Sequence, residues 1–185
     1  MAQQLQTAPP LTLTRLTSLN SNLALAFDPS GSFEEGKGVS GLSVIDIKTK
    51  KFKAVGEIQA VKYKTKEAYW QAHIDLLEQV KPGHLVIEDF LLYAKNAKSL
   101  INSRFETSQL LGVMKFCSYR YGIKTELQLA SMVKGRWSNY VLEKKGYIKP
   151  KGRNWQTMDN VPLNGHIIDS MRHALHYANF KAGDE

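Results

Sequence analysis

The sequence predicts an α/β protein built on a five-stranded mixed sheet with helices on its faces. Five short apolar runs have the length and composition of strands, and they span residues 23–27, 41–47, 52–61, 84–87 and 123–127. A short turn joins the second run to the third, which favours antiparallel neighbours. The fourth run lies between helical segments, which favours parallel pairing inside the sheet. We therefore expect the order β-β-β-α-β-α-β-α-α, with three antiparallel strands followed by parallel strands.

The first and fourth strands each end at an acidic residue. Residues 23–27 lead directly to Asp28, and a Pro29-Ser30-Gly31-Ser32 turn follows. Residues 84–87 lead to Glu88 in the same way. Asp89 comes next and should point to the opposite face, because side chains alternate along a strand. The pattern indicates two buried strands that present carboxylates at their ends.

Three helices are expected between the first strands and the last helix. The first covers residues 67–80 and is stopped by Pro82-Gly83, and the second covers residues 99–121 and is stopped by Gly122. Residues 130–145 have a helical pattern as well. Residues 146–165 then read as one long polar and basic loop, and loops of that length are usually functional or disordered.

The last helix, over residues 165–179, carries the clearest chemical pattern. Its apolar positions recur at steps of three and four, which is the helical period. His166, Asp169 and His173 are three and four residues apart, so they share one flank of this helix. A carboxylate between imidazoles is costly to bury without a partner, and a divalent cation would supply one.

Composition limits the class of protein. We expect a flexible extension over residues 1–22, which has neither the basic start nor the apolar core of a secretory signal, and one folded domain over residues 23–180. Cys117 is the single cysteine, which excludes an internal disulfide, and no cysteine cluster suggests zinc. No run of 18 or more apolar residues is present, so we expect no membrane span.

The formal charge of +8 favours a polyanionic partner, and nucleic acid fits better than a membrane surface. A generic basic surface is the alternative. Phe90, Tyr93 and Trp155 could stack on unpaired bases or pack in the core. The basic candidates for phosphate contact are Lys95, Lys98, Arg104, Lys134, Arg136, Lys144, Lys145, Lys149, Lys151 and Arg153.

Three acids from separate elements, Asp28, Glu88 and Asp169, suggest a metal-dependent nuclease. Carboxylate oxygens are the ligands that Mg²⁺ and Mn²⁺ prefer, and two such ions can activate water and stabilise the leaving oxygen of a phosphodiester. His166 is a candidate ligand or general acid–base group, or a histidine exposed at the start of a helix. His173 is expected to support the site from outside or to pack. The remaining histidines are expected to be structural: His73, His84 and His176.

Several motifs resemble the RuvC family of Holliday junction resolvases, within the RNase H-like superfamily. They occur in the family's order between about residues 23 and 177. They are Phe27-Asp28-Pro29-Ser30-Gly31, Glu88 followed by Ala94-Lys95-Asn96-Ala97-Lys98-Ser99-Leu100, Gln109-Leu110-Leu111-Gly112-Val113, and His166-Ile167-Ile168-Asp169.

The resemblance implies an RNase H-like fold, two Mg²⁺ or Mn²⁺ ions per active site, and a cytoplasmic homodimer that cuts four-way DNA junctions with symmetric nicks. The catalytic and metal-binding residues would be Asp28, Glu88, His166 and Asp169, with Lys134 near a basic residue that meets phosphate. The divergence is of a kind seen in phage-encoded members, which would act in the host cytoplasm.

The chain also departs from the family pattern. One extra residue lies between Glu88 and the Ala94 motif, so both Phe90 and Tyr93 qualify as the base-stacking aromatic. Residues 146–165 and the N-terminal extension are not family features. A related RNase H-like nuclease for phage packaging, flap cleavage or RNA processing stays open as a second function. A catalytically silent nucleic-acid-binding module stays open as a third.

Overall fold

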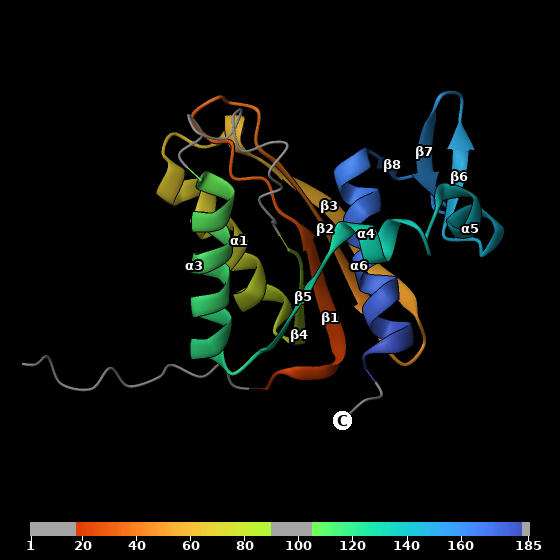
Figure 1. The fold of residues 1–185 in the computed structure, drawn as a ribbon, viewed down its shortest axis with the longest axis horizontal. Helices are drawn as coiled ribbons and strands as arrows, with labels where there is room; N and C mark the ends of the chain where they lie inside the picture. The colour runs from red at the N-terminus through yellow and green to blue at the C-terminus, as the bar shows by residue number, and fades with distance from the viewer. Residues whose placement is uncertain (1–17, 90–104, 183–185) are drawn as a thin grey trace, which may run out of the picture.

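A five-stranded sheet forms the centre of the protein, with the strand order β3-β2-β1-β4-β5 (Figure 1). The computed structural model describes residues 18–89 and 105–182. β1 (Asn20–Asp28) pairs antiparallel with β2 (Val39–Asp46), which pairs antiparallel with β3 (Lys51–Gln59). On its other side, β1 pairs parallel with β4 (Pro82–Glu88), and β4 pairs parallel with β5 (Lys124–Gln128). The predicted fold class, including the change from antiparallel to parallel pairing, is confirmed.

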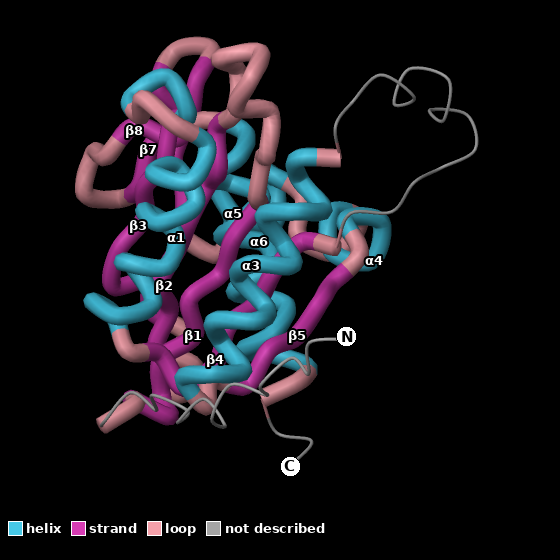
Figure 2. The backbone as a smooth tube through the Cα atoms, turned by 90° about the vertical axis from the view of Figure 1, so that its left-hand side faces the viewer, coloured by secondary structure: helices cyan, strands magenta, loops and turns pink. Residues whose placement is uncertain are grey.

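Helices cover both faces of this sheet. α1 (Lys66–Val80) and α3 (Glu106–Tyr121) lie on one face, as Figure 2 shows from that side. α6 (Gly165–Phe180) lies on the other. Successive side chains of β1 alternate between the two layers, because Leu25 and Phe27 pack under α1 and α3 while Ala24 and Ala26 pack under α6. The small alanines let α6 approach the end of β1 closely.

The helix ends follow local chemistry. Thr65 precedes α1 and its hydroxyl accepts a hydrogen bond from Ala68 N at 3.2 Å. Asn164 precedes α6, and its side-chain oxygen accepts from Ile167 N at 2.9 Å. Gly122 ends α3 with φ of 77°, a left-handed conformation that glycine adopts without strain. A short 3-10 turn, η1 (Ala60–Lys62), connects β3 to the segment before α1.

The single helix predicted over residues 130–145 is wrong. The structure has two short helices there, α4 (Ala130–Lys134) and α5 (Asn139–Lys144). Ser138 starts the second helix, because its hydroxyl accepts from Val141 N at 3.4 Å. The helix predicted from residue 99 begins at Glu106 in the structure, and residues 99–104 lie outside the described part. β1 begins three residues before the predicted strand.

The long loop predicted over residues 146–165 is also wrong. These residues form a second, antiparallel sheet of β6 (Ile148–Lys151), β7 (Asn154–Thr157) and β8 (Pro162–Leu163). Ile148 and Leu163 are buried in the cluster under α6, which anchors the small sheet there. Strands this short have too few alternating positions to give a periodic signal in the sequence. Residues 146–165 therefore resemble a polar loop when the sequence is considered alone.

Two glycines mark close backbone approaches around the end of β1. A Cβ added at Gly41 of β2 would lie 2.0 Å from the carbonyl oxygen of His166. A Cβ added at Gly31 would lie 2.1 Å from the backbone nitrogen of Thr107. The absence of these side chains therefore lets the start of α6 and the start of α3 sit directly against the segments on either side of Asp28. Among the described residues, no helix has the length and hydropathy that a membrane span requires.

Candidate metal centre

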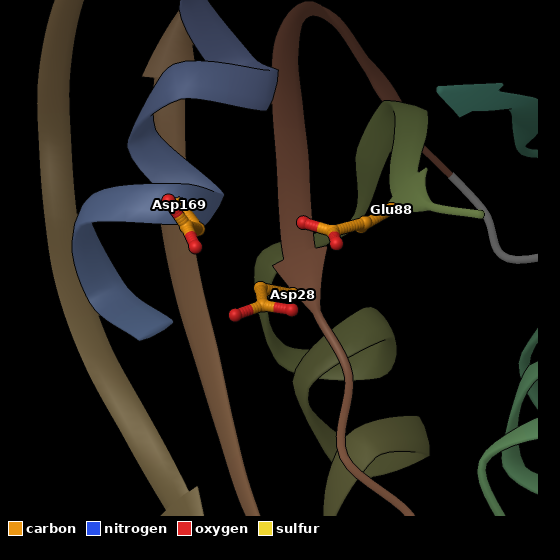
Figure 3. Close-up of side chains that lie close together, drawn as sticks. All are labelled: Asp28, Glu88 and Asp169. Atoms are coloured by element: carbon orange, nitrogen blue, oxygen red, sulfur yellow. The ribbon is translucent and has the colours of Figure 1, made fainter. Parts of the chain in front are cut away.

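Three carboxylates from three elements converge at one end of the sheet (Figure 3). Asp28 ends β1, Glu88 ends the parallel neighbour β4, and Asp169 lies on α6. One oxygen from each lies within 4.8 Å of the other two. The structure thus brings together the three acids that the sequence placed at strand ends and on the last helix.

These carboxylates are only slightly exposed, with side-chain exposures of 14% for Asp28, 19% for Glu88 and 16% for Asp169. Burial raises the pKa of Asp28, and the neighbouring charges of Glu88 and Asp169 raise it further against the opposing hydrogen bond from His166. An oxygen cluster of this kind gains stability from any cation that enters it.

His166 contacts one acid of the cluster. Its Nδ1 lies 2.7 Å from Asp28 Oδ2, and 47% of its side chain is exposed. The hydrogen bond with Asp28 raises the pKa of His166, although partial burial opposes the shift. The protonated ring is therefore favoured by this contact, and about half of the side chain faces solvent.

Lys134 and Arg172 supply positive charge to the same cluster. Lys134 Nζ lies 2.9 Å from Asp169 Oδ2 and 3.9 Å from Glu88 Oε1. Burial lowers the pKa of Lys134, but its interactions with Asp169, Glu88 and Asp28 outweigh this and raise it overall. Arg172 pairs with Asp169, and its Nε donates to the Trp137 carbonyl at 2.8 Å. Sequence reasoning missed Arg172, although it lies three residues after Asp169 on the same helix.

His173 supports Glu88 from inside the protein. The ring is fully buried, with Nε2 at 2.9 Å from Glu88 Oε2 and Nδ1 at 3.1 Å from Gln128 Oε1. It therefore orients a site carboxylate instead of only packing. Gln128 was not singled out from the sequence, because it lies 45 residues from His173 and only the β4–β5 pairing brings it close.

A neutral buried network holds the turn that follows Asp28. The Ser40 hydroxyl accepts from Ser30 N at 3.0 Å, and the Tyr69 hydroxyl donates to the Ser30 carbonyl at 2.6 Å. His73 Nε2 and the Tyr69 hydroxyl each lie 2.9 Å from Ser40 Oγ. Burial lowers the pKa of His73 to about 4, so this ring stays neutral at physiological pH. His73 is structural as expected, but it belongs to the support of the Asp28 turn.

The other sequence candidates lie away from the three acids or outside the described residues. Arg136 stacks on Phe180 with its guanidinium carbon 4.3 Å from the ring centre, near the end of α6. Asp89 is not part of the cluster, and its backbone N–H donates to the Gln128 carbonyl at 2.8 Å. His84 hydrogen-bonds Tyr177 and the Ser21 carbonyl, while His176 lies against Phe180. The predicted DNA contacts that fall outside the described residues are Phe90, Tyr93, Lys95, Lys98 and Arg104.

Comparison with known proteins identifies the fold. A structure of Thermus thermophilus RuvC in complex with Holliday junction substrate superposes with a TM-score of 0.58, covering 84% of this chain and 92% of that one. The chain has a RuvC-like fold. A second Thermus thermophilus RuvC structure gives the same TM-score and covers 93% of its own chain. Both are 14% identical to this protein, a level at which the likeness shows the fold alone.

Sequence comparison adds no further relationship, because no family model matches this chain and no curated protein matches it. The case for a metal therefore rests on the donor set. Three carboxylates whose oxygens converge within 4.8 Å suit a hard divalent cation such as Mg²⁺ or Mn²⁺. Asp28, Glu88 and Asp169 are the residues that would hold it.

Proposed function

We propose that this protein is a Mg²⁺- or Mn²⁺-dependent DNA endonuclease that resolves four-way junctions. The convergence of Asp28, Glu88 and Asp169 at one end of the sheet is the observation that carries the proposal. The RuvC-like fold supports it, because one of the similar RuvC structures holds a Holliday junction substrate. The charge of +8 agrees with a polyanionic substrate.

The three acids would hold two divalent ions. Bound ions of this type activate a water molecule and stabilise the leaving oxygen in phosphodiester hydrolysis. Glu88 is held in place by His173, at 2.9 Å, and the turn after Asp28 is held by the Tyr69 and Ser40 network. These supports fix the carboxylates before the substrate arrives.

Two cationic side chains are placed to act on the phosphate. Lys134 lies between Glu88 and Asp169, so its ammonium group can meet the charge that develops on the scissile phosphate. His166 has one nitrogen on Asp28 and an accessible ring edge, so it can contribute a metal ligand or transfer a proton at its other nitrogen. We include His166 with the three acids in the catalytic set.

A homodimer suits this substrate. Two copies related by a two-fold axis would present two such clusters to two strands of like polarity, which gives symmetric nicks. The proposed DNA contacts remain those that follow Glu88 in the sequence, Phe90, Tyr93, Lys95, Lys98 and Arg104, together with Lys134 and Arg136.

The test compares a synthetic mobile junction, a Y-fork and a linear duplex, each incubated with Mg²⁺ and mapped on a gel. We expect the junction to be cut preferentially, with symmetric nicks, and cleavage to stop with chelator present. Equal cutting of the Y-fork or duplex would favour a different RNase H-like nuclease. Binding without cleavage of any substrate would favour a silent nucleic-acid-binding module.

The matched pair Asp28→Asn and Asp89→Asn ties the activity to the cluster. Asp28→Asn should abolish cleavage and leave junction binding intact, because the amide removes a metal ligand without removing surface cations. Asp89→Asn makes the same chemical change beside Glu88 but outside the cluster, and it should cut at the parental rate. Undiminished cleavage by Asp28→Asn would contradict the proposed site.

A further inference from the structure

A groove runs between the outer edge of the main sheet and the small sheet. β3 is the outermost strand of the five-stranded sheet, and β6 to β8 lie beyond it next to α6. The groove consists of two hollows of about 840 Å³ and 590 Å³. Val55 and Val161 line both hollows, so the two are neighbours.

The charged groups that face this groove are mostly lysines. Two acids also line it, Glu57 and Asp159, and Glu57 accepts hydrogen bonds from Asn164 and Gln59, so the five lysines outnumber the acids. Lys50 Nζ donates to the Asn179 side-chain oxygen at 2.8 Å. The groove therefore favours a polyanion. The lysines are Lys50, Lys51, Lys53, Lys145 and Lys151.

Aromatic rings lie among these lysines. Phe52 and Tyr147 meet edge to face at a centroid distance of 5.7 Å, and Trp155 lines the second hollow. All three residues are half-buried, with one side packed against the hydrophobic core. Positive charge that follows the backbone, combined with rings that bases can stack on, is the recurring design of sites for single-stranded nucleic acid. Hollows of about 840 Å³ and 590 Å³ offer room for a few nucleotides.

α6 lies between this groove and the acidic cluster, and it contributes residues to both. Ile167 and Met171 line the groove, whereas Asp169 and His173 belong to the cluster. The two pairs lie on nearly opposite sides of the helix, because residues two apart differ by about 200° in direction. Asn164, which caps α6, lines the end of the groove, so the groove leads to the turn that carries His166.

We propose that this groove binds one unpaired DNA strand on the side of α6 opposite the catalytic cluster. The proposal rests on the proposed nuclease function and extends it, since an enzyme that opens a branched substrate leaves a strand to be held. The groove is built from β3 together with the small sheet of residues 148–163, so this binding site depends on both elements.

The test measures binding of a fluorescently labelled oligothymidylate by anisotropy, with chelator present so that no cleavage occurs. The double variant Lys51→Ala/Lys53→Ala removes two exposed groove charges. The control Lys64→Ala/Lys115→Ala removes two exposed charges from the α1 and α3 side of the sheet. We expect about tenfold weaker binding for the groove variant and less than about twofold for the control. The groove variant should also show a shallower dependence on salt, by about 1.4 in the log–log slope, as expected for two lost phosphate contacts on a single strand.

Two competitors test the kind of ligand. An abasic strand of equal length should bind several-fold more weakly than the oligothymidylate, because it has no bases to stack. Poly-L-glutamate should displace the labelled strand poorly. Equal binding of the abasic strand, or displacement by polyglutamate as effective as that by unlabelled oligothymidylate, would overturn the assignment and indicate a general polyanion or acidic-peptide site.

The groove and the nuclease can fail separately in this design. If junctions are cut but the groove variant binds oligothymidylate as the control does, the groove proposal is wrong and the nuclease proposal stands. If no junction is cut but the lysine pair still controls strand binding, the groove stands as a nucleic-acid site and the nuclease proposal is wrong.

Discussion

Two polar regions lie on either side of the end of β1, and they are stabilised in opposite ways. The acidic cluster is charged, slightly exposed and offset by Lys134, Arg172 and the histidines. The network of Ser40, Tyr69 and His73 is neutral, sealed from water and satisfied by its own hydrogen bonds. In the first region, opposite charges face one another and an incoming cation can rearrange them. In the second region, hydrogen bonds fix the backbone of the turn after Asp28. The comparison predicts that mutations in the first region change chemistry and those in the second change stability.

The largest effect should come from Glu88→Gln. Replacing this carboxylate removes a metal ligand and weakens charge stabilisation by several kcal/mol, so we expect cleavage to fall by about 10³-fold or more. Thermal stability without metal should change little, because the amide keeps its size and can still bond His173. Single-turnover cleavage and thermal melting of the same sample measure the two quantities.

Glu67→Gln is the matched control for this change, since Glu67 lies in the first turn of α1 and outside the cluster. It should leave the cleavage rate unchanged. If Glu88→Gln lowered the thermal stability as severely as the cleavage rate, the claim that mutations in the acidic cluster change chemistry and not stability would be wrong.

Acid should destabilise the neutral network through His73. The pKa of this ring is about 4 in the folded protein against 6.5 when unfolded, so the unfolded chain binds the extra proton. The contribution of His73 to the free energy of unfolding is therefore complete above pH 6.5. It is lost as the pH drops toward 4, by about 3 kcal/mol in total. Denaturant unfolding at a series of pH values measures the slope.

His73→Gln removes the titrating ring and should flatten this part of the pH profile, although its stability at neutral pH will be lower. The expected difference is a shallower slope between pH 6.5 and 4 than in the parent. Parallel profiles for the two proteins would show that His73 is not the group responsible.

His173→Ala should weaken metal binding without removing a ligand. Partners that orient a ligating carboxylate typically contribute 10-fold to 100-fold in metal affinity, and His173 is the buried partner of Glu88. Calorimetric titration with Mn²⁺ measures the change. His176→Ala, one turn away in sequence but against Phe180, should bind Mn²⁺ as the parent does.

Rescue separates orientation from simple packing at this position. His173→Gln retains a donor toward Glu88 and should recover part of the lost affinity. If alanine and glutamine at position 173 weaken Mn²⁺ binding equally, the ring contributes volume and not a hydrogen bond to the carboxylate.

The smallest effect should come from Tyr69→Phe. The hydroxyl donates to the Ser30 carbonyl in a buried setting, so its loss should lower the free energy of unfolding by about 1 to 2 kcal/mol. Cleavage at saturating metal should fall much less than in Glu88→Gln. Tyr63→Phe, which alters a neighbouring ring in contact with Tyr69, is the control and should change the unfolding free energy by less.

The sequence predicted the parts of this structure that repeat locally. Apolar runs that end in an acid defined β1 and β4, and parallel pairing then brought Asp28 and Glu88 to the same edge. The helical period of the last segment located Asp169 and His166 correctly on one helix. Element order and helix stops sufficed for the fold class, because the strands of the main sheet are long enough to carry a pattern.

Partners that meet only through the tertiary fold could not be predicted in this way. The contact between His173 and Glu88 joins residues 85 apart, and Gln128 reaches the same ring from a third element. The small sheet was missed because each of its strands has at most four residues. The position of the small sheet beside β3 depends on the packing of Ile148 and Leu163 under α6, and no local sequence pattern predicts that contact.

The contact at Gly41 has a consequence for engineering the site. β2 meets the first turn of α6 backbone to backbone, with the position of an added Cβ only 2.0 Å from the His166 carbonyl oxygen. A single methyl group there would have to tilt the helix, and the tilt would carry His166 and Asp169 away from Asp28 together. Gly41→Ala would thus change the distance between Asp28 and Asp169 without altering the chemistry of any ligand.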